Sequence, residues 1–188
     1  AQGMLHLDMP ETDLVMDEAG RVVDAHPADD SYPHTMIEMF MVEANVAVAT
    51  LLDRRNLPFL RRIHPDPSPM SMKHLARLLK TFGIALPRSA ARHTIQDLLK
   101  SVAGTDMALG INIAVLRSLE KAVYAPLHIG HYALASTHYC HFTSPIRRYA
   151  DLTVHRMLQH VLDKRPDQAQ QSVAALDLGA IGRQISFT

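Results

Sequence analysis

The sequence is poor in three features, each typical of a particular class of protein. Cys140 is the single cysteine among 188 residues, which excludes an internal disulfide framework and fits a reducing, cytoplasmic location. No uninterrupted apolar run approaches the roughly 18–20 residues that span a bilayer, so no membrane partner is expected. The formal net charge is zero with the histidines neutral, which argues against nucleic-acid binding by bulk positive charge. Any phosphate binding must therefore depend on a few arginines at specific positions.

Apolar residues make up 47% of the sequence, which is enough to bury a sizeable core in one domain or part of one. The chain starts at Ala1 rather than at a methionine, and it stops abruptly after Ile185-Ser186-Phe187-Thr188. We therefore expect a fragment of a longer protein.

The residue pattern predicts an α+β, predominantly helical fold in which short N-terminal strands precede several helices. Leu14–Met16 and Arg21–Ala25 flank the hairpin-type turn Asp17–Gly20. Asp29-Asp30-Ser31 is an N-cap signal for the first helix, and Ser71 is one for the second. Apolar spacing predicts helices over residues 32–54, 71–82, 94–101, 107–121, 144–163 and 167–180. Residues 56–69 and 124–143 are expected to be irregular or extended.

The most informative segment runs from His141 to Tyr149. Ser144 is a good N-cap and Pro145 fits the first helical position, which predicts a helix that starts here. Arg147 and Arg148 would then lie in the first turn, where the helix dipole disfavours cations. An anion should offset that cost, and phosphate is the natural candidate because guanidinium groups bind it bidentately.

The alternative is a solvated salt-bridge face. In a helix, Arg147, Arg148, Asp151 and His155 share one side, and Asp151 could pair with either arginine. Residue chemistry alone leaves this alternative and the phosphate site equally supported. The opposite side is expected to be core, and it comprises Ile146, Tyr149, Ala150, Thr153, Met157 and Val161.

Two polar residues interrupt the apolar stripe of the first long helix. Glu38 and Asn45 are seven residues apart and so share a face. Buried polar groups need partners. For Asn45 the favoured interpretation is that it satisfies loop backbone, whereas Glu38 could equally do this or contact a sugar hydroxyl of a substrate.

The histidines and carboxylates give weaker signals. His128-x-x-His131, and His138 with Cys140 and His141, could suggest zinc, but the spacing is loose and no second cysteine supports it. Metal-assisted hydrolysis of RNA needs clustered carboxylates around Mg²⁺, and this sequence contains no such set. We therefore expect no specific metal ion in this chain, and a buried, inert thiol at Cys140.

A long sequence pattern resembles the signature of RNB-family exoribonucleases of the ribonuclease II and ribonuclease R type. The resemblance rests on Gly130–Ala135, on Tyr139–Leu152 and on His155-Arg156. Four further segments resemble the same family more weakly, so the match covers nearly the whole chain. They are the opening strand pair, Met36–Ala47, Arg62-Ile63-His64 before Pro67, and Gly182–Thr188.

The resemblance implies a processive 3′→5′ hydrolase that degrades single-stranded RNA to nucleoside monophosphates with Mg²⁺. Arg147 matches the arginine thought to contact the scissile phosphate, which would make it the catalytic residue. Glu38 matches a glutamate near the 3′-terminal nucleotide, and Arg148 and Tyr149 match supporting, substrate-binding positions. His64 matches a motif residue to which the resemblance assigns no role.

The resemblance also implies what residues 1–188 lack. They correspond to the C-terminal portion of one RNB catalytic domain, whose metal-binding aspartates lie upstream, and to neither the cold-shock nor the S1 domain. We expect this chain to be inactive alone, to expose apolar surface where the missing half of its domain packs, and to be capable of self-association. Two further hypotheses are a non-catalytic RNA-binding or assembly module that kept the fold, and a zinc-binding helical protein.

Overall fold

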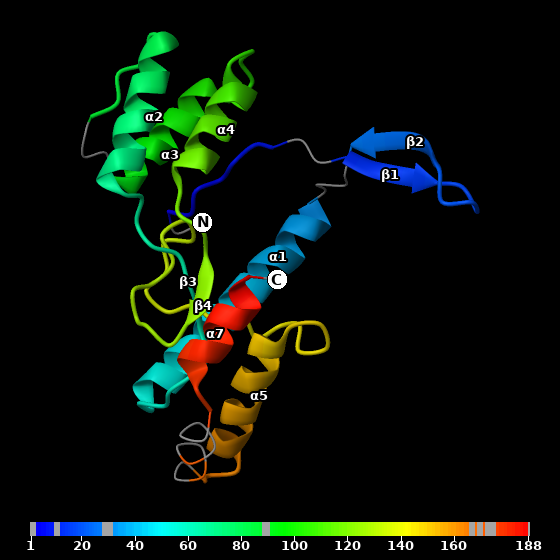
Figure 1. Cartoon of the computed structure of the whole chain (residues 1–188), viewed down its shortest axis with the longest axis vertical. Coiled ribbons are helices and arrows are strands. Elements are labelled where there is room, and N and C mark those ends of the chain that lie inside the picture. The colour runs from blue at the N-terminus through cyan, green and yellow to red at the C-terminus, as the bar shows by residue number, and fades with distance from the viewer. Residues whose placement is uncertain are drawn as a thin grey trace.

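The computed structural model describes residues 3–9, 12–27, 32–87, 91–165, 168, 171 and 176–187. Figure 1 shows two lobes, with a β-hairpin standing away from both. The elements, in chain order, are β1 (Thr12–Met16), β2 (Val22–Pro27), α1 (Tyr32–Arg54), β3 (Arg61–Ile63), α2 (Pro69–Thr81), α3 (Arg92–Val102), α4 (Ala108–Ser118), β4 (Val123–Ala125), α5 (Tyr149–Leu162) and α7 (Leu178–Ser186). The predicted α+β, helix-rich class is confirmed.

The hairpin β1–β2 is the strand pair predicted from the sequence. The two strands are antiparallel, with Leu14 opposite Ala25. Asp17 closes the turn by accepting the backbone N–H groups of Ala19 and Arg21, each at 2.9 Å. Gly20 has a φ of +75°, which a residue without Cβ adopts at no steric cost. The predicted N-cap Asp29-Asp30-Ser31 lies outside the described residues.

One lobe is a three-helix layer formed by α2, α3 and α4 (Figure 1). Its core contains apolar residues from all three helices, and Leu5 and Leu7 of the N-terminal segment pack against it. That segment is also tied down by polar contacts, because Asp8 N–H donates to Asn112 Oδ1 at 2.9 Å. The cap of α2 is Ser68 rather than the predicted Ser71. Pro69 takes the first helical position, and the N–H of Ser71 donates to Ser68 Oγ at 3.1 Å.

The other lobe packs α1, α5 and α7 around the short antiparallel pair β3–β4. Ala49 and Leu52 of α1, Phe59 before β3 and Val154 of α5 meet in its core. Helix α7 lies against β4, and a Cβ on Gly182 would collide with the carbonyl oxygen of Tyr124. The sequence did not predict β3 and β4. Each has three residues, too few for a strand periodicity, and β3 falls in the proline-rich stretch expected to be irregular.

Helix α1 is buried in the lobe only toward its C-terminal end. Its buried residues are Asn45, Ala49 and Leu52, whereas Ile37 and Phe40 nearer the N-terminal end are exposed. By length and composition, Tyr32–Arg54 could also cross a membrane, with a mean hydropathy of 1.5 over 18 residues. This differs from the expectation in the sequence analysis, where the lack of a long uninterrupted apolar run predicted no membrane-spanning segment. A core helix of a soluble domain passes the same test, so the observation alone does not favour a membrane span.

Candidate functional site

The segment from Tyr139 to Tyr149 carries most of the predicted site residues, and Asn45 anchors it on α1. The side chain of Asn45 is buried; its Nδ2 donates to Tyr139 Oη at 3.1 Å, and its Oδ1 accepts the N–H of Phe142 at 2.8 Å. The Asn45 carbonyl accepts from Cys140 Sγ at 3.5 Å. Burial raises the pKa of Cys140 to about 12, so its thiol is neutral and not nucleophilic. The structural interpretation of Asn45 is thereby confirmed.

Helix α5 holds the same segment from the other side. His155 Nε2 lies 2.8 Å from the carbonyl oxygen of Phe142, and the two rings stack with centroids 4.3 Å apart and planes 14° apart. A carbonyl only accepts, so Nε2 of His155 carries the proton. Phe142 is therefore fixed through its backbone N–H by α1 and through its carbonyl and ring by α5.

Helix α5 starts later than the sequence predicts. Pro145–Arg147 form a separate turn, closed by Arg148 N–H donating to the Ser144 carbonyl at 3.1 Å. Arg148 is the N-cap, with an extended backbone (φ −126°), and the helix begins at Tyr149. The physical reason is Asp151, whose carboxylate accepts the N–H of Ser144 at 2.8 Å and holds the turn apart from the helix. Neither arginine therefore lies in the first helical turn.

Arg148 is bound within the protein. Its Nη2 donates to Asp151 Oδ1 at 2.8 Å, and the Asp151 side chain is fully buried. Nη2 also approaches Thr143 Oγ1 at 3.4 Å. The predicted pairing of Asp151 with an arginine therefore forms at Arg148, where Asp151 supplies the anion, but the face is not solvated as that alternative expected, because Asp151 is buried. Arg148 shapes the turn, and its guanidinium is not free to grip a phosphate through Nη2.

Arg147 has the opposite character. Its side chain is exposed, and it forms no hydrogen bond or ion pair with any other described residue. It is therefore the arginine of this segment that can bind an external anion. Tyr149 next to the turn is 44% exposed and Ile146 is fully exposed. The prediction that these two residues belong to the core is wrong, because the turn before α5 takes Ile146 off the helical surface that Ala150, Thr153 and Met157 bury.

Glu38 is exposed on α1, two helical turns before Asn45. The residues share a face as predicted, but they differ in burial because α1 emerges from the lobe between them. Across the described residues, no hydrogen bond or ion pair links Glu38 to Arg147, Arg148 or Tyr149. The latter three follow one another at the start of α5, and no direct polar contact among the described residues joins Glu38 to them.

Sequence reasoning missed a half-buried group of side chains that includes His141 of this segment. The Arg62 guanidinium lies 4.6 Å from the centroid of the Tyr124 ring, and Tyr124 Oη contacts His141 Nδ1 at 2.7 Å. Burial lowers the pKa of His141 to about 4 and raises the pKa of Tyr124 above its usual value, so both are neutral near pH 7. The pairing of β3 with β4 brings Arg62 to Tyr124, and the sequence offered no signal for that pairing.

His64 is buried in a second group of rings. It contacts His131 with centroids 4.9 Å apart and accepts the N–H of Ala133 on Nδ1 at 3.3 Å. Burial lowers the pKa of His131 to about 3. Gly130 next to it has a φ of +78°, and a Cβ there would lie 2.8 Å from the Ser136 carbonyl oxygen. His64, whose role the sequence left open, thus contacts the loop at residues 130–136 through both its ring and its backbone.

The zinc pairings considered as an alternative do not form among the described residues. His131 and His141 are engaged with neighbouring rings, and Cys140 is buried against α1. In the described ranges, one group of three side chains could hold a metal ion: Asp53, His128 and His138. Mg²⁺ prefers oxygen ligands and keeps several waters, so two imidazoles do not suit it. The described residues thus do not form a magnesium site.

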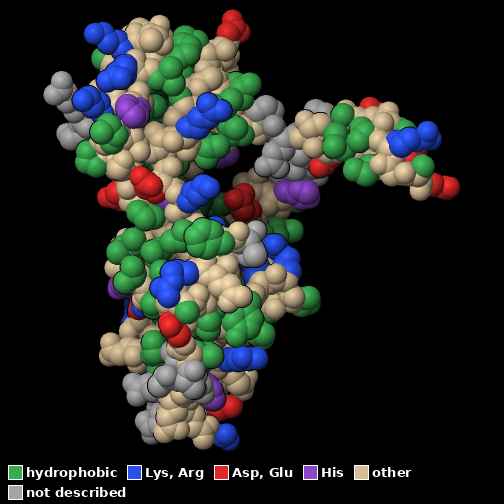
Figure 2. Space-filling model, in the orientation of Figure 1, with side chains coloured by type: hydrophobic (Ala, Val, Ile, Leu, Met, Phe, Trp, Pro, Cys, Tyr) green, Lys and Arg blue, Asp and Glu red, His purple; other side chains and the backbone are tan. Residues whose placement is uncertain are grey.

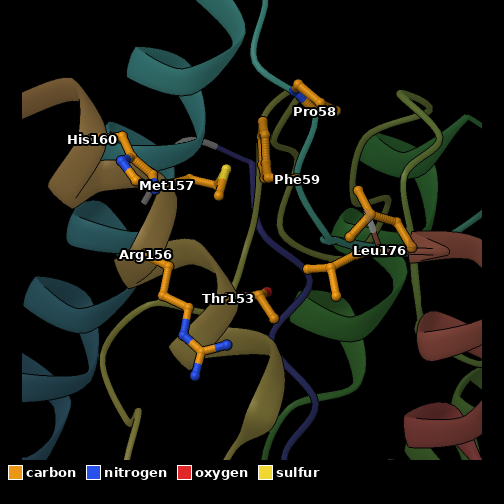
Figure 3. A pocket seen from close by; sticks show the side chains of 8 residues that line it. Pro58, Phe59, Thr153, Arg156, Met157, His160 and Leu176 are labelled. Atoms are coloured by element: carbon orange, nitrogen blue, oxygen red, sulfur yellow. The ribbon is translucent and has the colours of Figure 1, made fainter. Parts of the chain in front are cut away.

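A cavity of about 280 Å³ lies between α5 and the chain that leads into β3 (Figure 3). Phe59 and Met157 give it an apolar wall, and Arg156 and His160 contribute polar atoms. On the face drawn in Figure 2, Lys and Arg side chains are distributed over both lobes rather than gathered in one continuous patch. This agrees with the zero net charge and leaves individual arginines as the means of binding phosphate.

Comparison with known proteins decides the family. The model of the RNB domain matches residues 1–164. This chain belongs to the RNB family. Ribonuclease R of Thermotoga maritima is 37% identical over 174 residues, which cover 89% of this chain and 24% of the relative. The structure of Mycoplasma genitalium RNase R in complex with double-stranded RNA aligns with a TM-score of 0.87 and 31% identity, over 99% of this chain and 34% of that chain.

A third similar structure is that of yeast Ssd1, a pseudonuclease. Its structure aligns with a TM-score of 0.65 and 26% identity, over 85% of this chain and 20% of that chain. This chain spans only about a quarter of the length of the curated relatives it matches, such as 24% and 26% for two ribonuclease R proteins. Nucleases of the family are generally metal-dependent.

Proposed function

We propose that this chain is the C-terminal portion of the catalytic domain of a processive 3′→5′ exoribonuclease. The whole protein would hydrolyse single-stranded RNA to nucleoside monophosphates with Mg²⁺, and residues 1–188 alone would be inactive. The observation that carries the proposal is the exposed guanidinium of Arg147, which pairs with no other described residue and stands next to an arginine that Asp151 holds in place. The ribonuclease R relatives support the assignment of this activity.

The roles of the two arginines differ in this proposal. Arg147 would bind the phosphate at which hydrolysis takes place, where a planar guanidinium can offer two parallel N–H groups and stabilise developing negative charge. Arg148 would be a positioning residue that acts through Asp151, since its pairing fixes the turn that carries Arg147. A scaffold of buried contacts from Asn45 and His155 would limit the movement of that turn.

Tyr149 and Glu38 would complete the contacts with RNA. The Tyr149 ring is 44% exposed next to Arg147 and could stack on a base or a ribose. Glu38 would accept hydrogen bonds from the hydroxyl groups of the 3′-terminal nucleotide. Since Glu38 and Arg147 share no contact among the described residues, we expect the RNA strand itself to bridge them.

The exposed apolar side chains of α1 support the view that further protein covers this helix. Met36, Ile37, Phe40 and Met41 are each 40% exposed or more. A folded domain rarely leaves so many large apolar side chains of one helix in water. We propose that the missing half of the catalytic domain, with the Mg²⁺-binding carboxylates, packs here in the whole protein.

A second candidate function is a non-catalytic RNA-binding or assembly module. It is favoured by the likeness to the pseudonuclease Ssd1 and by the lack of a carboxylate cluster for Mg²⁺ among the described residues. In this case Arg147 would still bind phosphate, but no hydrolysis would follow.

One experiment separates these functions. Single-stranded RNA labelled at its 5′ end is incubated with Mg²⁺ and either the 188-residue chain or a protein that carries it within a complete RNB domain. We expect the complete domain, but not the 188-residue chain, to shorten the RNA from its 3′ end. RNA whose 3′ end is blocked should be protected. If the complete domain binds the RNA but leaves it intact, the exoribonuclease proposal is wrong and the second candidate stands.

A further inference from the structure

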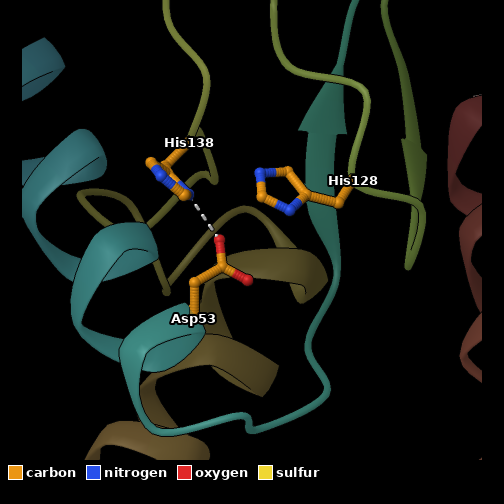
Figure 4. Close-up of side chains that lie close together, drawn as sticks. All are labelled: Asp53, His128 and His138. Atoms are coloured by element: carbon orange, nitrogen blue, oxygen red, sulfur yellow. Dashed lines mark hydrogen bonds and ion pairs between the residues drawn. The ribbon is translucent and has the colours of Figure 1, made fainter.

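Asp53, His128 and His138 lie together where the end of α1 meets the loops that follow β4 (Figure 4). One ligand atom from each residue lies within 4.8 Å of the other two. Asp53 and His138 are half-buried, whereas His128 is exposed and also lines an open polar cavity of about 400 Å³. Two of the three side chains are therefore held within the protein, while the third is open to solvent, from which an ion can reach the group.

The hydrogen bonds around the group leave ligand atoms available. His128 Nε2 lies 3.1 Å from the carbonyl oxygen of Thr137, which can only accept, so Nε2 carries the proton. In the neutral ring, Nδ1 of His128 then keeps a free lone pair. Metal-binding histidines commonly donate their second nitrogen to a backbone carbonyl in this way, which fixes both tautomer and ring orientation.

The two oxygens of the Asp53 carboxylate contact different partners. Its Oδ1 pairs with Arg61 Nη2, and its Oδ2 contacts His138 Nδ1 at 2.7 Å. An ion that replaced the shared proton between Oδ2 and Nδ1 would leave the Arg61 contact intact. Arg61 would then be the outer partner that orients a ligating carboxylate.

A purely structural network of Arg61, Asp53 and His138 is the simpler alternative. It explains the position of two members of the group but not of the third. His128 is exposed, comes from a different loop, and holds its ring 4.9 Å from that of His138 (Figure 4). A metal ion would account for all three side chains together.

We propose that Asp53, His128 and His138 bind a divalent transition metal ion of the Zn²⁺ type. Two imidazole nitrogens and one carboxylate oxygen are ligands that Zn²⁺ accepts readily, and three protein ligands leave a fourth position for water. With bonds of about 2.0–2.1 Å, a tetrahedral ion holds its ligand atoms roughly 3.3 Å apart. The contact of 2.7 Å and the overall spread of 4.8 Å bracket that value, so small side-chain rotations suffice.

The ion would clamp the end of α1 to the segment that leads into Tyr139. His138 directly precedes Tyr139 in the chain. The Tyr139 hydroxyl accepts a hydrogen bond from Asn45, which lies on α1 before Asp53. The metal and Asn45 would thus fasten one segment to one helix at two points. This proposal revises the expectation that the chain holds no specific metal ion, and it does not depend on the proposed hydrolysis of RNA.

The test uses the 188-residue chain after removal of metals with a chelator. Calorimetric titration with Zn²⁺ measures affinity and stoichiometry, and titration with Co²⁺ followed by visible absorption reports nitrogen and oxygen ligands directly. His128→Gln and His138→Gln remove one imidazole each. His74→Gln, an exposed histidine on α2, is the matched control. Thermal unfolding in the presence of chelator shows whether each variant is folded.

We expect one Zn²⁺ per chain, a Co²⁺ spectrum, and a loss of affinity of about tenfold or more in His128→Gln and His138→Gln but not in His74→Gln. Because His128 is exposed, its variant should fold normally even if His138→Gln does not. Failure of the parent chain to bind Zn²⁺ and Co²⁺ would overturn the proposal, and so would unchanged affinity in His128→Gln.

Discussion

The buried carboxylate of Asp151 accepts a hydrogen bond from Arg148 Nη2 at 2.8 Å, three residues away across the start of α5. The same Oδ1 atom accepts the backbone N–H of Ser144, so a single carboxylate closes the turn and neutralises its cation. Arg147 lies inside that turn and takes no part in the pair. The relationship distinguishes Arg148, which is held by Asp151, from Arg147, which forms no hydrogen bond or ion pair with another described residue.

Asp151→Asn should therefore destabilise the chain. Breaking a buried ion pair costs about 3–5 kcal/mol, and we expect roughly 2–3 kcal/mol here because the Arg148 side chain stays 21% exposed. Urea unfolding followed by circular dichroism measures the loss. The exposed Asp163 at the end of α5 supplies the control Asp163→Asn. Equal stability of the Asp151→Asn variant and the parent would show that the pair does not hold the turn.

Asn45→Leu removes the amide that joins α1 to Tyr139 and Phe142. The buried Tyr139 hydroxyl and the half-buried Phe142 N–H lose their partner, so we expect a decrease in the free energy of unfolding of about 1–3 kcal/mol. Proteolysis between residues 139 and 149 should also become faster than in the parent. The comparison variant is Asn112→Leu in the other lobe, which should destabilise the chain without exposing that segment. Loss of protection in both variants alike would argue against a local role for Asn45.

The stability of the chain should fall as the pH drops below about 6.5. His131 and His141 have folded pKa values of about 3 and about 4, because burial disfavours their charged forms, against 6.5 when unfolded. Between these values the unfolded chain binds protons that the folded chain does not. Full stability is therefore present above pH 6.5, and each histidine removes at most about 1.4 kcal/mol per pH unit below it.

Urea unfolding between pH 7.5 and pH 5 measures this slope. His141→Gln, which cannot titrate, should lower the slope by the contribution of one histidine. His74→Gln on the surface of α2 should leave it unchanged. A slope in His141→Gln that matches the parent would place the pH dependence elsewhere.

The N-terminal half of α1 should make the 188-residue chain associate with itself. Ile37 and Phe40 are 56% and 70% exposed, and their apolar surface has no partner among the described residues. We expect Ile37→Ser with Phe40→Ser to shift the chain toward the monomer in sedimentation velocity, with no loss of thermal stability. Leu162→Ser, which changes an equally exposed residue of α5, is the control. Association that persists in the double variant would locate the contact on another surface.

Local patterns predicted the elements that depend on local forces. The helical spacing of Ile37, Met41 and Val48 predicted α1 over the range that the structure gives it, and the turn at Asp17–Gly20 predicted β1–β2. The start of α5 was misplaced because Ser144 and Pro145 have the chemistry of a cap. In the folded chain, a carboxylate seven residues away takes up the Ser144 N–H and sets the boundary instead.

Contacts between distant parts of the chain were beyond sequence reasoning. Asp53 and His138 are 85 positions apart. The zinc hypothesis therefore named His128 and His138 but, because it grouped residues by spacing, placed them in separate pairings and left out Asp53. The three-residue strands β3 and β4 are too short to show a periodicity in the sequence. Because their pairing was not predicted, neither was the contact between Arg62 and Tyr124. The resemblance to the RNB family supplied Arg147 as the catalytic candidate and Arg148 as a supporting residue, and the structure added the pairing of Arg148 with Asp151.

The central claim is that Arg147 acts on the phosphate that is hydrolysed. Single-turnover degradation of single-stranded RNA, measured with Arg147→Ala in a protein that carries this chain within a complete RNB domain, tests it most directly. We expect turnover to fall by about 100-fold or more, with little change in RNA affinity or melting temperature, and no effect of Arg77→Ala on the surface of α2. Normal turnover in Arg147→Ala would contradict the account, as would a loss that weaker RNA binding fully explains.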